Sequence, residues 1–86
     1  MFVIVTYDVN RRRGPKVLKV CKKYLAHTQK SVFEGNLTRK QLDKMEKELK
    51  NVIDSSSDQI MIYCLESTKY TWKEQIGSIT SNDTIL

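Results

Sequence analysis

The sequence contains few of the residues that build disulfide-rich, zinc-binding or histidine-dependent proteins. Its 86 residues include two cysteines and one histidine. Cys21 and Cys64 are too few for a disulfide framework, suit a reducing compartment, and have a separation that fits no zinc pattern. We therefore expect both to be buried thiols. His27 has no cysteine or carboxylate at ligand spacing, so we expect a structural role for it.

The chain also lacks a long hydrophobic run, an internal repeat and a low-complexity segment. The apolar residues Phe2–Val5 are too few for a transmembrane helix or a signal peptide. Ser55, Ser56 and Ser57 have no partner in the sequence that could act as a general base, and they are typical of a loop. No aromatic-rich RNA-recognition signature is present, which argues against base reading by stacking. These absences favour a small, soluble, cytoplasmic domain that does not interact with a membrane.

What the chain does have is an excess of positive charge. Its net charge is +5 and its isoelectric point is about 9.3. Such a balance favours a polyanionic partner. A chain of 86 residues makes one domain and buries a limited fraction of its surface. Association with a second copy is therefore a reasonable way to complete its core.

The hydrophobic pattern predicts a strand and then a helix in the first third of the chain. Phe2–Tyr7 is rich in β-branched and aromatic residues with almost no polar break, as in a strand covered on both faces. Pro15 suits the first turn of a helix, where its missing N–H is not needed. The helix that follows has lysines on one side and an apolar stripe on the other, formed by Val17, Val20, Cys21 and Tyr24.

The middle of the chain predicts an extended segment and a second helix. Thr28–Leu37 is extended, and a bend is expected at Glu34–Asn36. The spacing does not decide between one bent strand and two short strands. Thr38 and Gln41 form a capping box that begins the second helix. The helix is followed by a polar loop at 54–58.

The end of the chain predicts one more buried strand, Ile60–Leu65, and a tail. The order strand, helix, extended segment, helix, strand predicts an α+β sandwich with both helices on one face of an antiparallel sheet, and a ferredoxin-like arrangement is the simplest choice. We assign residues 1–67 to this domain. Residues 68–86 carry too few apolar side chains for a core of their own, so we expect them to pack on a second copy or a partner protein.

Asp8 is the first candidate for chemistry, because it ends a predicted strand next to a cluster of arginines. Mg²⁺ prefers oxygen ligands and is often held by one or two carboxylates together with waters and substrate phosphates. One Asp8 per chain can therefore suffice if a second copy supplies another. The alternative is that Asp8 caps a turn through its side chain.

The basic residues after Asp8 are candidates for binding phosphate. Arg11, Arg12 and Arg13 can each form bidentate contacts to a phosphate group. With Lys16 and Lys19 of the first helix they form an electrostatic footprint suited to nucleic acid. The alternative is a solvated loop.

Several of these segments resemble a known family. Val5–Val9 with the arginine-rich helix start, followed by Gln29–Leu37, is similar to the small CRISPR-associated endonuclease that works in spacer acquisition, the Cas-two family. The likeness continues through the second helix and Asp58–Tyr63 and covers roughly the whole chain. Its more specific parts are the strand-terminal Tyr7-Asp8 and the segment Ser31–Gly35.

The resemblance implies a ferredoxin-like βαββαβ fold, a two-fold homodimer and an extra C-terminal strand that crosses onto the partner subunit. It also implies that Asp8 from each chain faces the other at the dimer cleft and shares a magnesium ion there. Members are described as metal-dependent endonucleases acting on RNA or double-stranded DNA. They are also described as the scaffold between two dimers of the integrase that inserts new spacers.

Three hypotheses follow. In the first, the chain is a homodimeric endonuclease in which two Asp8 carboxylates hold Mg²⁺, the three arginines position the nucleic-acid backbone, and Tyr7 and Phe33 line the cleft. Considered apart from the resemblance, Tyr7 and Phe33 are aromatics of the core or its border. In the second, the chain is a non-catalytic nucleic-acid-binding adaptor that docks the CRISPR adaptation integrase through its tail. In the third, it is a toxin-type ribonuclease with the same fold and dimer plan.

Overall fold

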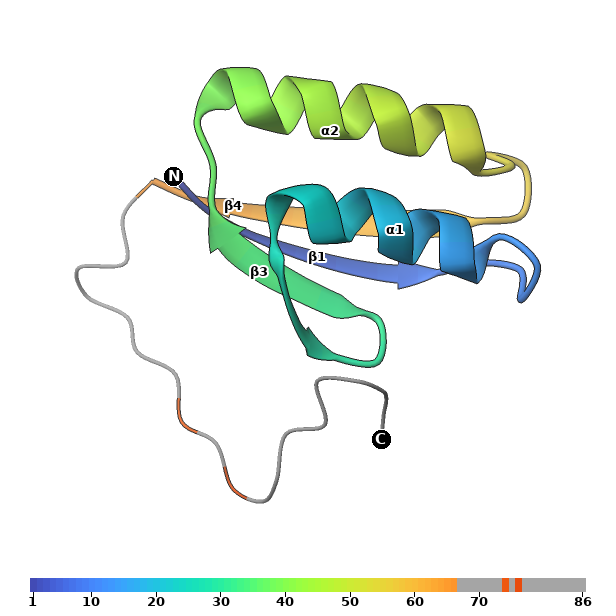
Figure 1. The fold of residues 1–86 in the computed structure, drawn as a ribbon, viewed down its shortest axis with the longest axis horizontal. Helices are drawn as coiled ribbons and strands as arrows, with labels where there is room; N and C mark the ends of the chain where they lie inside the picture. Colours follow the sequence, from blue (N-terminus) through green and yellow to red (C-terminus); the bar gives the residue numbers. More distant parts are fainter. Residues whose placement is uncertain (67–73, 75, 77–86) are drawn as a thin grey trace.

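A computed structural model describes residues 1–66, 74 and 76 of the chain. Two helices and four strands follow one another in the order βαββαβ, which confirms the predicted order (Figure 1). The elements are β1 (Phe2–Asp8), α1 (Gly14–Tyr24), β2 (Ala26–Gln29), β3 (Val32–Asn36), α2 (Arg39–Val52) and β4 (Gln59–Leu65). The predicted additional strand and the tail assignment at 68–86 lie outside the described residues, apart from isolated positions 74 and 76.

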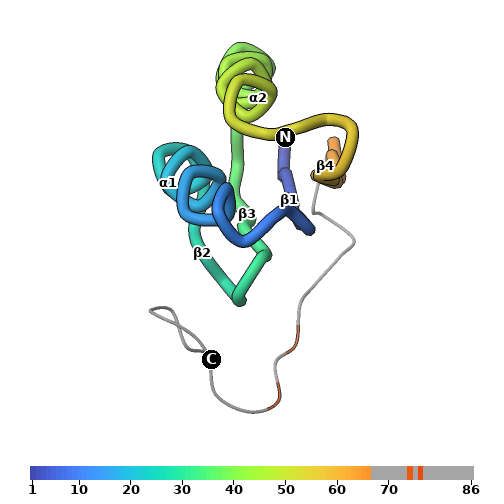
Figure 2. The backbone as a smooth tube through the Cα atoms, turned by 90° about the vertical axis from the view of Figure 1, so that its right-hand side faces the viewer, coloured from blue at the N-terminus to red at the C-terminus, as the bar shows by residue number. Residues whose placement is uncertain are grey.

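The four strands form one antiparallel sheet in the order β2-β3-β1-β4. Both helices lie on the same side of this sheet, and Figure 2, which looks along the helices, shows no helix of the described residues on the other side. This arrangement confirms the predicted α+β ferredoxin-like sandwich. Across the described part of the chain, the helices are too short or too polar to cross a membrane.

Alternation along the central strand β1 separates the two faces of the sheet. Val3 and Val5 are fully buried beneath the helices, whereas Ile4 and Thr6 point to the opposite face and stay partly exposed. The core joins both helices to the helix-facing rows of β1 and β3. Its members are Val3, Val5, Val17, Val20, Cys21, Leu25, Phe33, Leu37, Leu42, Met45 and Leu49.

The extended middle segment consists of two strands, and the bend expected at Glu34–Asn36 is wrong. The chain turns at Lys30 and Ser31, between β2 and β3. Gly35 lies inside β3 and pairs with Val3. A Cβ atom at Gly35 would come within 3.2 Å of the Leu25 side chain, just after α1. Glycine here serves a close approach of two chain segments and not a turn.

The second helix begins at the predicted capping box. The Thr38 hydroxyl accepts a hydrogen bond from the Gln41 amide at 3.1 Å, and the Gln41 side chain accepts one from the Thr38 amide at 2.9 Å. The helices are also joined to each other, because Lys23 and Tyr24 of α1 both donate to Glu48 of α2. The hydrogen bond from Lys23, with that from Tyr24, holds the pKa of Glu48 below its usual value.

The two cysteines occupy different environments. Cys21 is buried in the core as predicted, and burial raises the pKa of its thiol to about 12. The prediction that Cys64 is buried is wrong, because Cys64 is exposed on β4. β4 is an edge strand of the described sheet, so Cys64 has a neighbouring strand on one side alone.

Candidate functional site

Asp8 is the last residue of β1 and lies at the edge of the sheet face opposite α1 and α2. It is exposed and pairs with Gln59, the first residue of β4. Alternation places it in the same row as Ile4 and Thr6. Among the described residues its carboxylate has no hydrogen-bond or ion-pair partner. The carboxylate is therefore available to a ligand.

The turn after Asp8 is held by Asn10, so the structure gives the capping role to Asn10 and not to Asp8. The Asn10 side-chain oxygen accepts a hydrogen bond from the Arg12 amide at 3.0 Å. Its backbone carbonyl accepts from the amides of Arg13 at 2.9 Å and Gly14 at 3.1 Å, which starts α1. Arg11 and Arg12 stand exposed at the outside of this turn.

Arg13 has a different neighbour from the other two arginines. Its Nε donates to Oδ2 of Asp58 at 2.5 Å and its Nη2 to Oδ1 at 3.1 Å, a bidentate ion pair. Nη2 also lies 3.4 Å from the Ser57 hydroxyl. The sequence predicted that all three arginines bind phosphate. In the structure Arg13 is paired with Asp58, whereas Arg11 and Arg12 are exposed to solvent.

Asp58 is a residue of the site that sequence reasoning missed. The hydrogen bond from the Arg13 side chain holds the pKa of Asp58 far below its usual value, and the same bond raises the pKa of Arg13. The pair is therefore ionised throughout the physiological range. The available signal was the position of Asp58 directly before β4, in a loop that otherwise reads as polar and solvated.

Tyr7 and Phe33 lie on the opposite face of the sheet from Asp8. Phe33 is fully buried, and its ring stacks on His27 with the centroids 4.4 Å apart and on Tyr7 with the centroids 6.3 Å apart. Burial, with a smaller contribution from Cys21, raises the pKa of Tyr7. Both rings therefore belong to the helix-side core and its border, which corrects the expectation that they line a cleft with Asp8.

The lysines assigned to nucleic acid are exposed on α1. Lys16 and Lys19 occupy its first half, close in sequence to Arg11 and Arg12. They lie on the outer surface of the helix, away from the buried residues Val17 and Val20. The basic residues thus continue from the turn onto the helix layer.

No group of three or more histidine, cysteine, aspartate or glutamate side chains that could hold a metal gathers in the part of the chain that the structure describes. One protomer therefore offers a single carboxylate at Asp8. This donor set suits magnesium if a second chain contributes, because Mg²⁺ needs few protein ligands and keeps waters and phosphate oxygens. It does not suit zinc, which takes three or four nitrogen and sulfur ligands.

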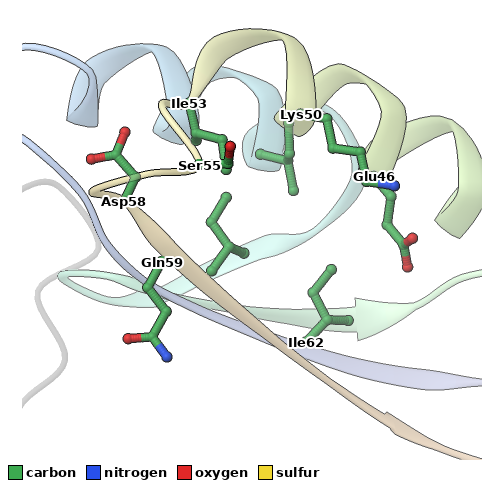
Figure 3. A pocket seen from close by; sticks show the side chains of 9 residues that line it. Glu46, Lys50, Ile53, Ser55, Asp58, Gln59 and Ile62 are labelled. Atoms are coloured by element: carbon green, nitrogen blue, oxygen red, sulfur yellow. The ribbon is translucent and has the colours of Figure 1, made fainter.

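A cavity of about 410 Å³ lies between the end of α2 and the start of β4 (Figure 3). Leu49, Ile53, Ile60 and Ile62 supply its apolar lining, and Asp58 and Gln59 lie at the turn into β4. The isoleucines of β4 that line it belong to the helix-facing row. The cavity is thus on the other side of the sheet from Asp8.

The chain matches the family model described as CRISPR associated protein Cas2 over residues 1–72. It belongs to the Cas2 family. A protein of Dictyoglomus turgidum named CRISPR-associated endoribonuclease Cas2 is 38% identical over 77 residues, covering 90% of this chain and 88% of the relative. One of the same name from Thermotoga maritima is 39% identical over 77 residues, with the same two shares.

Solved Cas2 structures have the same fold. A crystal structure described as cas2 superposes with a TM-score of 0.83 at 37% identity and covers 100% of this chain and 97% of its own. Streptococcus pyogenes Cas2 at pH 6.5 gives a TM-score of 0.78 at 35% identity, covering 90% of this chain and 100% of its own. The family resemblance drawn from Tyr7-Asp8 and Ser31–Gly35 is confirmed.

Proposed function

We propose that this chain is a magnesium-dependent endonuclease of a CRISPR system that acts on nucleic-acid phosphodiester bonds as a homodimer. The observation that carries the proposal is Asp8, an exposed carboxylate without a partner among the described residues, at the edge of an apolar sheet face. The family match supports the CRISPR setting, and it favours this reading over a toxin-type ribonuclease.

The homodimer is supported by the open face of the sheet. Met61 and Tyr63 of β4 are 42% and 51% exposed there, next to the partly exposed Ile4 of β1. Phe2, paired with Leu65, extends the same row. An apolar face of this kind is typical of a protein interface. A second copy packed on it through a two-fold axis would bring two Asp8 edges toward one another.

Two Asp8 side chains, one from each copy, would hold the magnesium ion. The metal would neutralise charge on a phosphate oxygen and lower the pKa of a bound water. Arg11 and Arg12 hold the phosphate backbone through bidentate hydrogen bonds, and Lys16 and Lys19 add longer-range attraction. No base-reading element is assigned, so cleavage depends on backbone geometry more than on sequence.

RNA is the first substrate to test, because the curated relatives are named endoribonucleases. Double-stranded DNA is the second. The decisive experiment incubates purified protein with each substrate, with magnesium or with a chelator. We expect cleavage that needs magnesium and is lost in Asp8→Ala, while nucleic-acid binding and dimer mass are retained.

The matched control is Asp43→Asn, which removes the same charge from an exposed position of α2. Its activity should equal that of the natural sequence. Full cleavage by Asp8→Ala would contradict the assignment of Asp8. Cleavage of neither substrate by the natural sequence would favour the second candidate function below.

The second candidate is a DNA-binding scaffold that works with the CRISPR adaptation integrase. It is favoured by the charge of the helix layer, where α1 carries four lysines and no carboxylate. The helix α2 contains five basic and three acidic residues. This surface lies on the other side of the sheet from Asp8, so it can bind a duplex backbone without the catalytic edge. In that case Asp8→Ala should still support spacer acquisition with the integrase.

A further inference from the structure

The residue that departs furthest from ordinary burial rules is Asp58. Among the described residues it is the one charged side chain that is buried, and 1% of that side chain is exposed. A buried carboxylate is costly unless its oxygens accept hydrogen bonds from well-placed donors. The donors that surround Asp58 therefore indicate which parts of the chain its carboxylate joins.

Both carboxylate oxygens of Asp58 accept two hydrogen bonds. Oδ1 accepts from the Asn10 amide at 2.9 Å and from Nη2 of Arg13 at 3.1 Å. Oδ2 accepts from Nε of Arg13 at 2.5 Å and from the Asp54 amide at 2.9 Å. One carboxylate thus ties the turn after β1 to the loop before β4. Figure 1 shows these two connections at the same end of the molecule.

These bonds are next to the candidate catalytic residue. Asp8 and Gln59 form the last pair of the β1–β4 ladder, and Asn10 and Asp58 are the first contacts beyond it. Asn10 then holds the amide of Arg12, as described above. Position and direction of the Asp8 end of β1 are therefore set on one side by the ladder and on the other by Asp58.

The same contacts fix the arginines that face solvent. Arg11 and Arg12 lie between Asn10 and Arg13, and both of these bounding residues are bonded to Asp58. A turn held at both ends loses little conformational freedom when a ligand binds, so its side chains are preorganised. Removing the carboxylate would free the turn and leave the partly exposed Arg13 guanidinium without its acceptor.

We propose that Asp58 and Arg13 are positioning residues: their ion pair holds the Asp8 carboxylate and the Arg11–Arg12 turn in the geometry that binds a phosphodiester backbone. This inference rests on the proposed function. It assigns Arg13 to the support of the site and Arg11 and Arg12 to the ligand. Asp58 touches no substrate in this arrangement and acts through the turn.

The test uses Asp58→Asn and the milder Arg13→Lys, which keeps the charge but loses the two-pronged geometry. Two control variants match them. Asp43→Asn removes the same charge from an exposed position of α2 outside the Asp58 hydrogen bonds, and Thr38→Ala weakens the capping box at the opposite end of β1. All four proteins are compared as full chains at equal magnesium, pH and salt.

The first readout does not depend on activity. Amide hydrogen exchange and chemical shifts of Asp8, Arg11 and Arg12 should change in Asp58→Asn and Arg13→Lys and stay unchanged in both controls. Unchanged amides in the two ion-pair variants would overturn the inference, whether or not the protein cleaves anything. If Asp58→Asn does not fold, Arg13→Lys decides alone.

The second readout separates positioning from loss of stability. We expect kcat on the cleaved substrate to fall roughly 10- to 100-fold in Asp58→Asn, with a smaller change in KM. Thr38→Ala should lose stability with unchanged kcat. Equal loss of kcat in Thr38→Ala and Asp58→Asn at matched stability would reduce Asp58 to a structural role. If the amides change in the two ion-pair variants but the natural sequence cleaves neither substrate, the proposed function is contradicted and the positioning inference is still supported.

Discussion

On its helix side the sheet of this chain is closed by α1 and α2, whereas on its open side the same four strands meet solvent. Alternate residues of β1 supply both surfaces, Val3 and Val5 to the first and Ile4 and Asp8 to the second. The helix side is filled by residues of one chain, and Phe33 is its fully buried aromatic. The open side is apolar at Phe2, Ile4 and Tyr63, and it also carries the carboxylates of Glu34 and Asp8. The folding core and the proposed catalytic carboxylate thus lie on two different faces of one sheet.

The largest effect on stability is expected on the helix side. Phe33→Ala removes a fully buried ring that stacks on Tyr7 and His27, so the free energy of unfolding should fall by about 3–5 kcal/mol. Chemical denaturation monitored by circular dichroism measures this loss. A change below about 1 kcal/mol would contradict the division between the faces, because substitutions at surface positions usually change stability by so little.

The next effect is expected on the open side and concerns association. Tyr63→Asp places a charge on the open face of β4, opposite Ile4. The protein should keep its secondary structure, while its mass in solution falls from that of a dimer to 10.0 kDa. Light scattering over a range of concentrations measures the mass. Asn51→Asp adds the same charge on exposed α2 and should leave the dimer intact.

Where the two faces meet, the turn after Asp8 should control nucleic-acid affinity. The double variant Arg11→Gln, Arg12→Gln removes the two proposed phosphate contacts of each chain. The slope of log affinity against log salt should then become shallower by about 0.9 for each lost contact on duplex DNA. Fluorescence anisotropy with a labelled duplex gives the slope. An equal change in Arg39→Gln, Lys40→Gln, at the far end of the helix layer, would indicate binding spread over all basic residues.

The smallest expected effect near neutral pH is the contribution of the Asp58 carboxylate to the pH dependence of stability. Its pKa is lowered in the folded chain, chiefly by the hydrogen bond from Arg13. As pH falls below about 3.9, the unfolded chain takes up a proton that the folded chain refuses, so stability falls with pH. Above that value the contribution is fully present. Acid denaturation should show a steeper loss for the natural sequence than for Asp58→Asn, and identical profiles would count against the ion pair.

Much of the fold could be predicted from local signals. The capping box at Thr38 and Gln41 fixed the start of α2 because both of its hydrogen bonds lie within four residues. The strands at both ends of the domain were found from their β-branched runs. The turn at Lys30 and Ser31 was missed, because Gly35 suggested a bend while its real reason is contact with Leu25. That contact is a property of the packed molecule.

The candidate site was predicted in part, for a similar reason. Asp8 stood out because it ends an apolar strand beside arginines, and both features are local. The sequence alone does not distinguish Arg13 from Arg11 and Arg12, because its ion-pair partner Asp58 is 45 positions away. Tyr7 neighbours Asp8 in the chain and faces the other side of the sheet, because successive residues of a strand alternate.

The apolar character of β1 on both faces has one more consequence. A strand whose two rows are nearly alike does not choose its own register, and a slip by one residue would exchange the rows. Contacts at its ends make the choice: Met1 and Leu37 exchange two backbone hydrogen bonds at 2.9 Å, and Asn10 is bonded to Asp58. One inserted or deleted residue between Asp8 and Gly14 would have to break these contacts or turn the carboxylate toward the core. The length of that turn is therefore as much a part of the site as any side chain in it.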